Sequence, residues 1–144
     1  MRVIVQRAKD AKCIIDNKIY SSIDHGYVLL VGFKEGDDEN IINKMIKKII
    51  NLRIFEDESG KMNLNIKQVN GSILSISQFT LYANTNDGNR PSFCGALSGD
   101  KSIVLYEKFN ELLSKEIEVK TGVFGAEMGI SFLNDGPCTI SLEF

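Results

Sequence analysis

The order of apolar and polar residues divides the chain into segments with two different periods. Residues 1–9 and 12–20 are rich in β-forming residues, and Asp16 and Asn17 interrupt the second segment as a turn pair would. Residues 26–33, GYVLLVGF, form an apolar run bounded by glycines, which is typical of a strand covered on both faces. The pattern therefore predicts a hairpin-like start and then a buried strand.

A helical period begins at about residue 38. Six apolar residues recur at helical spacing and form one stripe: Ile41, Ile42, Met45, Ile46, Ile49 and Ile50. Asp37 or Asp38 is a suitable N-cap for this helix. The opposite side carries Lys44, Lys47 and Lys48, which is typical of a solvated helix face, and a phosphate-facing patch is the alternative interpretation.

The rest of the chain contains further strands, a polar loop and a second helix. Residues 56–60 predict a turn, residues 72–83 a strand, and residues 84–93 a polar loop. A second helix is expected at about residues 100–115, with four residues facing inward: Leu105, Phe109, Leu112 and Leu113. Residues 127–134 and 138–144 alternate as strands do. This order predicts an α+β fold with two main helices on a largely antiparallel sheet.

Composition agrees with one ordinary globular domain over residues 1–144. A chain of this length, with 43% hydrophobic and 25% charged residues, can bury a core without disulfides or metals. No segment approaches the roughly 20 apolar residues of a membrane span, and the amino-terminal residues lack a signal-peptide pattern, so we expect a cytoplasmic protein without a membrane partner. The net charge of −2 predicts that any nucleic-acid partner is bound locally.

Few residues fit a familiar hydrolytic or metal site. Cys13, Cys94 and Cys138 are widely spaced and lack a CxxC or histidine pair, which favours free thiols. A Cys–His or Ser–His pair would have to use His25, the only histidine, which lies in a turn-like sequence. The acids show no metal-ligand spacing, and glycine-rich phosphate loops are absent, so we expect neither a metal nor a cofactor.

Two short motifs remain as candidate functional segments. SQFTLYA, residues 77–83, places three uncharged hydrogen-bonding side chains, Ser77, Gln78 and Thr80, after an apolar strand. If that strand continues through residue 80, Gln78 and Thr80 share one face, and Ser77 and Phe79 share the other. NDGPCT, residues 134–139, is the second motif. Taken alone, the first is also typical of a polar strand end and the second of a turn.

Both motifs, in this order and spacing, resemble those of the D-aminoacyl-tRNA deacylases. That family's signatures are SQFTLxA and NxGPxT, and both are intact in this chain. The segments MRVIVQRA, RIFEDESGKMNLN and NRPSF add to the resemblance, which extends from Met1 to Phe144. Cys138 departs from the valine that is frequent in the second motif, and Gly99 from a proline that is frequent before the second helix.

The resemblance implies an enzyme that hydrolyses the ester between a D-amino acid and the 3′ end of tRNA, and that also hydrolyses mischarged glycyl-tRNA. It further implies a barrel-like sheet and a homodimer. A related family that deacylates a different mischarged tRNA has methionine at the position of Phe79 and a trans Gly-Pro bond. Phe79 therefore favours the D-specific branch.

Site residues are implied by the same resemblance. Ser77, Gln78, Phe79 and Thr80 would contact the ester. The Gly136–Pro137 bond would be cis, and this dipeptide would enter the pocket of the other subunit and exclude L-amino acids, held in place by Arg7. Further residues are implied near the substrate: Leu81, Ala83, Met128, Asn134 and Thr139.

An aminoacyl ester is already activated, so positioning and backbone N–H groups that stabilise the oxyanion can suffice without a histidine. We expect water as the nucleophile, assisted by the 2′-hydroxyl of the terminal ribose, with Gln78 and Thr80 orienting the reacting groups. Two other functions stay open. One is a non-catalytic module that binds tRNA or protein. The other is an esterase that uses Thr80 or Cys94 as nucleophile on another small ester.

Overall fold

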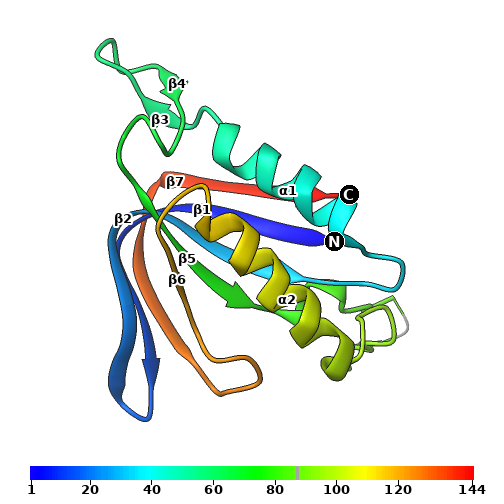
Figure 1. Cartoon of the computed structure of the whole chain (residues 1–144). Helices are drawn as coiled ribbons and strands as arrows, with labels where there is room; N and C mark the ends of the chain where they lie inside the picture. Colours follow the sequence, from blue (N-terminus) through cyan, green and yellow to red (C-terminus); the bar gives the residue numbers. More distant parts are fainter. Residues whose placement is uncertain (87) are drawn as a thin grey trace.

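A five-stranded sheet with two helices on one face forms the body of the molecule (Figure 1). The computed structural model describes residues 1–86 and 88–144. In spatial order the strands of the main sheet are β6 (Val119–Thr121), β5 (Ser72–Ser77), β2 (Lys18–Gly32), β1 (Arg2–Ile15) and β7 (Gly129–Glu143). A separate hairpin, which projects from the body in Figure 1, consists of β3 (Phe55–Glu56) and β4 (Met62–Leu64).

The main sheet is mixed and open, so the expected barrel is wrong, and the expected largely antiparallel pairing is confirmed only in part. β1 pairs antiparallel with β2 and with β7, whereas β2 with β5 and β5 with β6 are parallel pairs. Among the described residues, the outer strands β6 and β7 have no partner on their outer sides within this sheet. A helix lies between β2 and β5 in the chain, and another between β5 and β6, and such crossovers return the chain in the same direction. The α+β class with two helices is confirmed.

The two helices occupy nearly the expected residues. α1 (Glu39–Asn51) begins after Asp38, whose side chain accepts a hydrogen bond from the Ile41 N–H at 2.9 Å, as the sequence predicts. α2 (Gly99–Ser114) lies beside α1. Both helices pack on sheet residues that include Val3, Leu29 and Val31. In the described part of the chain, no helix is long and apolar enough to cross a membrane.

A second, smaller core lies away from the helices. It forms because β1, β2 and the start of β7 bend, which Figure 1 shows for the β1–β2 hairpin. Register shifts in β1 at Cys13 and between β1 and β7 mark the bends, since an extra residue in one strand kinks the pair. The residues enclosed there include Ala8, Ala11, Cys13, Ile23, Val28, Leu74 and Ile76, with Met128, Ile130 and Phe132 beside them.

Two local expectations are wrong. β5 ends at Ser77, and the chain turns into a short 3₁₀ helix, η1 (Phe79–Tyr82), so the strand does not continue through residue 80. The Gln78 N–H makes the last bond to β2, at 2.7 Å from the Val31 oxygen. His25 lies within β2, paired with Lys9, and not in a turn. The hairpin turn falls instead at the Asp16–Asn17 pair, as expected, and the strands on both sides are long.

Candidate active site

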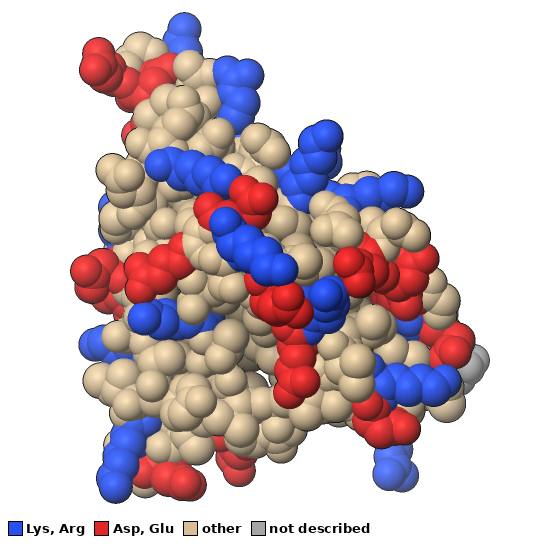
Figure 2. Space-filling view, in the orientation of Figure 1, with Lys and Arg blue, Asp and Glu red and all other residues tan. Residues whose placement is uncertain are grey.

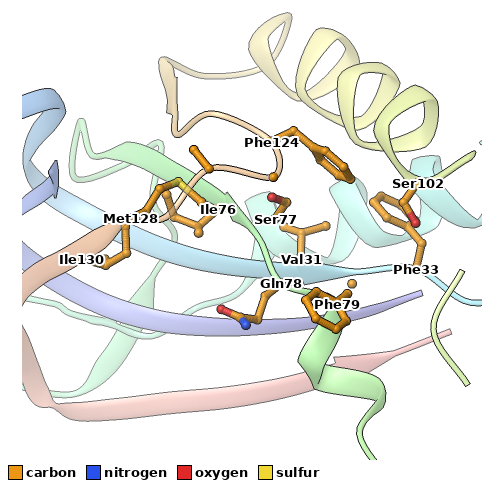
Figure 3. A pocket seen from close by; sticks show the side chains of 13 residues that line it. Val31, Phe33, Ile76, Ser77, Gln78, Phe79, Ser102, Phe124, Met128 and Ile130 are labelled. Carbon is orange, nitrogen blue, oxygen red and sulfur yellow. The ribbon is translucent and has the colours of Figure 1, made fainter. Parts of the chain in front are cut away.

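A cavity of ≈ 320 Å³ opens where β2 and β5 end (Figure 3). One wall consists of Val31, Phe33 and the start of the first motif, Ser77 to Phe79. Ser102 of α2 and the segment from Phe124 to Ile130 supply the opposite wall. Most of these side chains are apolar, and the Ser102 hydroxyl already donates to the Leu97 oxygen at 3.1 Å. The polar groups available inside the cavity therefore come mainly from the first motif.

The turn from β5 into η1 places backbone N–H groups beside this cavity. Phe79 and Thr80 are the first two residues of η1, and the first N–H groups of a helix have no acceptor inside it. Gly32 of β2 permits the close approach, because a Cβ there would lie 2.9 Å from the Gln78 carbonyl oxygen. Two N–H groups next to each other are the kind of donors that stabilise an oxyanion.

Side chains of the first motif fall into two groups. Ser77, Gln78 and Phe79 line the cavity, and the Gln78 Nε2 donates to the Thr80 Oγ1 at 2.5 Å. Phe79 is 55% exposed, and its ring packs edge-on against Phe93 with centroids 5.0 Å apart. Thr80 itself lies just outside the wall, and so do two further predicted site residues, Leu81 and Ala83. The Leu81 carbonyl accepts a hydrogen bond from Arg2, and the Ala83 N–H donates to the Thr80 carbonyl at 3.0 Å.

The second motif forms a bulge in β7. Asn134 pairs with Ala8 of β1 and Thr139 pairs with Gln6, so residues 135–138 lie opposite Arg7 alone. The side-chain amide of Asn134 and the hydroxyl of Thr139 are hydrogen-bonded at 3.0 Å across the neck of the bulge. Gly136 and Pro137, joined by a cis peptide bond, are exposed at its tip. The bulge thus presents main chain rather than large side chains to the surroundings.

Arg7 binds this bulge through its side chain. Its side chain is buried, and its Nε donates to the Asp135 carbonyl oxygen at 3.0 Å, while Nη1 donates to the Ile54 carbonyl oxygen at 2.7 Å. The Asp135 carboxylate lies 3.3 Å from the Arg7 Nε and 3.2 Å from the Lys9 Nζ. A Cβ on Gly136 would lie 3.1 Å from the Arg7 Nη2. The guanidinium therefore connects β1, the bulge and the chain before β3.

The two motifs lie far apart within one chain. Gln78 bonds to Val31, which pairs with Val3, and Val3 pairs with Leu142, five residues beyond Pro137 on β7. With about 4.8 Å between strands and about 3.3 Å per residue, the bulge is on the order of 20 Å from the cavity. Of the other predicted residues, Met128 lies at the cavity, and Arg7, Asn134 and Thr139 lie at the bulge.

The remaining candidates for chemistry have no catalytic surroundings. His25 lies six residues before Val31 along β2, about 20 Å from the cavity end, and its Nε2 contacts the Val69 oxygen at 2.9 Å. Cys13 and Cys138 are buried, and burial raises the pKa of the Cys13 thiol. Cys94 is exposed, with the Ser92 hydroxyl 3.3 Å from its sulfur. The described residues contain no group of three or more histidine, cysteine or acidic side chains placed to hold a metal ion.

Sequence reasoning missed most of the apolar wall. Val31, Phe33, Ile76 and Phe124 carry no separate signal, because an apolar residue has the same signal whether it faces a core or a cavity, and Ser102 belongs to no motif. Phe33 and Phe124 lie outside the regular elements, and no local pattern marks either of them as a cavity residue.

Comparisons with known proteins identify relatives over nearly the whole chain. The family model described as D-Tyr-tRNA(Tyr) deacylase matches residues 4–143. A D-aminoacyl-tRNA deacylase of Lactobacillus gasseri is 54% identical over 144 residues, which is 99% of each chain. Among solved structures, the c-Myc DNA unwinding element binding protein is similar with a TM-score of 0.95 and 37% identity, over 100% of this chain and 99% of that one.

A probable eukaryotic D-amino acid tRNA deacylase is a more distant structural neighbour. Its TM-score is 0.82 at 16% identity, over 98% of this chain and 97% of that one, which is a likeness of fold. The family model and the relative from Lactobacillus gasseri both extend over nearly the whole chain, including the cavity and the bulge. The chain therefore belongs to the D-Tyr-tRNA(Tyr) deacylase family.

Proposed function

We infer that the chain is a D-aminoacyl-tRNA deacylase, a hydrolase that cleaves the ester bond of aminoacyl-tRNA and releases free tRNA and a D-amino acid. Family membership over residues 4–143 supports this function. The observation that carries it is the first motif, which brings Ser77, Gln78 and Phe79 into the cavity wall beside two backbone N–H groups without a helical acceptor. Because its substrate is tRNA, we place the enzyme in the cytoplasm.

For the chemical step we propose attack by water on the ester carbonyl. The N–H groups of Phe79 and Thr80 would stabilise the developing oxyanion, and loss of one such donor typically costs roughly 2.7–4 kcal/mol. The 2′-hydroxyl of the terminal ribose would assist the water, with Gln78 and Thr80 orienting the reacting groups. The hydroxyl of Thr80 is bonded to an amide, which is no base, and this favours water over Thr80 as the nucleophile.

For chiral selection we propose a homodimer in which the bulge of one protomer completes the cavity of the other. Gly136 and Pro137 are exposed and on the order of 20 Å from the cavity of their own chain, so a second copy is needed to bring them together. Arg7 fixes the Asp135 end of the bulge. A main-chain wall at this place would clash with an L side chain, and glycine would pass it, so glycyl-tRNA is a second substrate.

Matched aminoacyl-tRNAs test the activity. Purified enzyme is incubated with D-tyrosyl-tRNA, L-tyrosyl-tRNA and glycyl-tRNA, and the release of amino acid is followed. We expect hydrolysis of the D and glycyl forms and not of the L form. Equal rates on both enantiomers would reject the chiral filter, and no turnover on any of the three would favour a non-catalytic binding module. A trapped acyl-enzyme would favour the esterase that uses Thr80 or Cys94 as nucleophile.

Subunit complementation tests the shared site. One variant carries Gly136→Val, which damages only the bulge, and the other carries Gln78→Ala, which damages only the cavity. Each homodimer should be inactive on D-tyrosyl-tRNA. In a two-fold symmetric heterodimer, one site combines both defects and the other site has none. Because about half of the randomly mixed dimers are heterodimers, the mixture should recover about a quarter of the wild-type activity. No recovery in verified heterodimers, or an active monomer by light scattering, would show that each chain works alone.

A further inference from the structure

The lysines of α1 form no ion pairs in the part of the chain that the structure describes, unlike those of α2. Lys44, Lys47 and Lys48 are exposed, and none of them forms an ion pair among the described residues. On α2, by contrast, Lys108 pairs with Glu39 and Glu111, and Lys115 directly after the helix pairs with Glu111 at 2.9 Å. The two helices are neighbours on one side of the molecule, yet ion pairs neutralise Lys108 of α2 and none of the three lysines of α1.

The sequence around α1 reinforces the contrast. Residues 40–55 contain Lys44, Lys47, Lys48 and Arg53 and no acid, although the whole chain has a net charge of −2. The side chain of Arg53 bonds to Asn63, which is neutral. Figure 2 shows blue side chains projecting over the α1 region, whereas blue and red alternate over α2. An unneutralised positive surface on an acidic protein indicates a local polyanion partner.

The position of α1 suits a part of the substrate that extends beyond the ester. Ser102 of α2 lines the cavity, and Lys108, six residues later, touches Glu39 at the start of α1. With a rise of about 1.5 Å per residue and helix axes about 8–10 Å apart, the lysines lie on the order of 20 Å from the cavity. α1 lies on the helical face of the sheet, in one core with Cys138, Ile140 and Leu142 of β7.

We propose that Lys44, Lys47 and Lys48 form a docking surface for the phosphate backbone of the tRNA while its 3′ end occupies the cavity. This inference rests on the proposed function, because the phosphates belong to the same substrate. The surface does not discriminate between nucleotide sequences, because exposed ammonium groups contact phosphates without base-specific geometry. It raises the affinity for any tRNA and leaves the chemical step unchanged.

A pair of triple variants tests this surface. The first is Lys44→Gln/Lys47→Gln/Lys48→Gln, and the matched control Lys108→Gln/Lys115→Gln/Lys120→Gln removes the same charge from lysines that have acidic partners. Each protein is measured on D-tyrosyl-tRNA and on 3′-O-D-tyrosyl-adenosine, which carries the same ester without the tRNA body. Binding of uncharged tRNA is measured in parallel between about 50 and 200 mM salt.

The α1 variant should lose roughly tenfold or more in kcat/KM on D-tyrosyl-tRNA at low salt. The slope of log affinity for uncharged tRNA against log salt should become less steep by about three, one for each phosphate contact. Turnover of the adenosine ester should stay the same for both variants. An unchanged slope and unchanged kcat/KM for the α1 variant, an equal loss in the control, or an equal loss on both substrates would overturn the docking surface. If the proposed function itself were wrong, the wild-type protein would be inactive on both D-tyrosyl-tRNA and the adenosine ester, which is a different result.

Discussion

Arg7 of β1 and Asp135 of β7 are joined twice, through the carbonyl oxygen of Asp135 at 3.0 Å and through its carboxylate at 3.3 Å. The same guanidinium also holds the Ile54 carbonyl at 2.7 Å, so one buried cation fixes three segments of the chain. A planar fork of N–H donors can make such divergent bonds, whereas an ammonium group concentrates its donors at one point. The shape of the bulge therefore depends on arginine at this position.

Arg7→Met should weaken both the fold and the bulge. The substitution leaves the Asp135 and Ile54 carbonyl groups without their donor, while Lys9 still contacts the Asp135 carboxylate. Two unsatisfied carbonyl groups at a buried site should lower the free energy of unfolding by about 3 kcal/mol. Displacement of the bulge should lower kcat/KM on D-aminoacyl-tRNA by roughly 100-fold. Arg7→Lys should keep most of the stability and still lose activity. Urea unfolding and deacylation assays measure both effects.

Lys9→Met is the control for this prediction, because Lys9 also contacts the Asp135 carboxylate, at 3.2 Å, but its side chain is 53% exposed. An exposed pair contributes less than about 1 kcal/mol. If Lys9→Met and Arg7→Met lowered stability and activity equally, the ion pairs with the Asp135 carboxylate would hold the bulge, and the carbonyl contacts of Arg7 would not.

Thr80→Val should slow deacylation without abolishing it. The valine variant keeps the main-chain N–H of residue 80 and loses only the hydroxyl that accepts from Gln78, so we expect a decrease of roughly 10–100-fold in kcat. Single-turnover kinetics on D-tyrosyl-tRNA measure the chemical step directly. Complete loss of activity in Thr80→Val, together with an acyl adduct on Thr80 in the wild type by mass spectrometry, would identify the hydroxyl as the nucleophile.

The cysteines should be dispensable for catalysis. Cys94→Ala is expected to retain wild-type kcat/KM, because the Cys94 sulfur accepts a hydrogen bond from the Ser92 hydroxyl and bonds to no base among the described residues. Cys13→Ala should lower the melting temperature, since Cys13 is fully buried in the smaller core, while kcat stays the same. A folded but inactive Cys94→Ala protein would revive a cysteine mechanism.

Gly26→Ala should prevent stable folding. Gly26 has a φ of 139° and pairs with Ser72 of β5, and a Cβ there would lie 1.9 Å from the Ser72 carbonyl oxygen, a backbone atom that cannot move independently. We expect a loss of more than about 4 kcal/mol in the free energy of unfolding. Gly36→Ala provides the control: its φ is 88°, nothing lies near its Cβ position, and the cost should be about 1–2 kcal/mol. Thermal unfolding of both variants compares them, and similar melting temperatures would contradict the clash.

Asp57 should titrate at unusually low pH. The hydroxyl of Ser59, then the N–H of Lys61 and the amide of Asn63, bond its carboxylate and hold its pKa at about 2. The folded-state pKa of Asp57 lies below the unfolded value. The ionised carboxylate therefore stabilises the turn between β3 and β4 above about pH 4, and this stabilisation is lost as the pH falls towards 2. The carboxyl NMR signal of Asp57 measures the midpoint. A midpoint near 4, or no change of the midpoint in Ser59→Ala, would contradict these bonds.

The apolar pattern determined the elements of this fold better than their arrangement. The isoleucine stripe and Asp38 fixed α1 nearly to the residue, and Asp16 with Asn17 fixed the hairpin turn, because caps, turns and amphipathic faces depend on neighbours in sequence. The parallel pairing of β2 with β5 and the open edges of the sheet depend on how the helices cross over the sheet, and no local signal specifies that path.

The candidate site divides in the same way. The two motifs identified the family from the sequence, and their residues could be named before any geometry was known. Only the tertiary structure decided that Gln78 leaves the strand for η1, that Phe124 and Ser102 close the cavity, and that Gly136 lies on the order of 20 Å away. The physical reason is that a cavity is formed by side chains from distant segments, and their contacts depend on packing, which local periodicity does not encode.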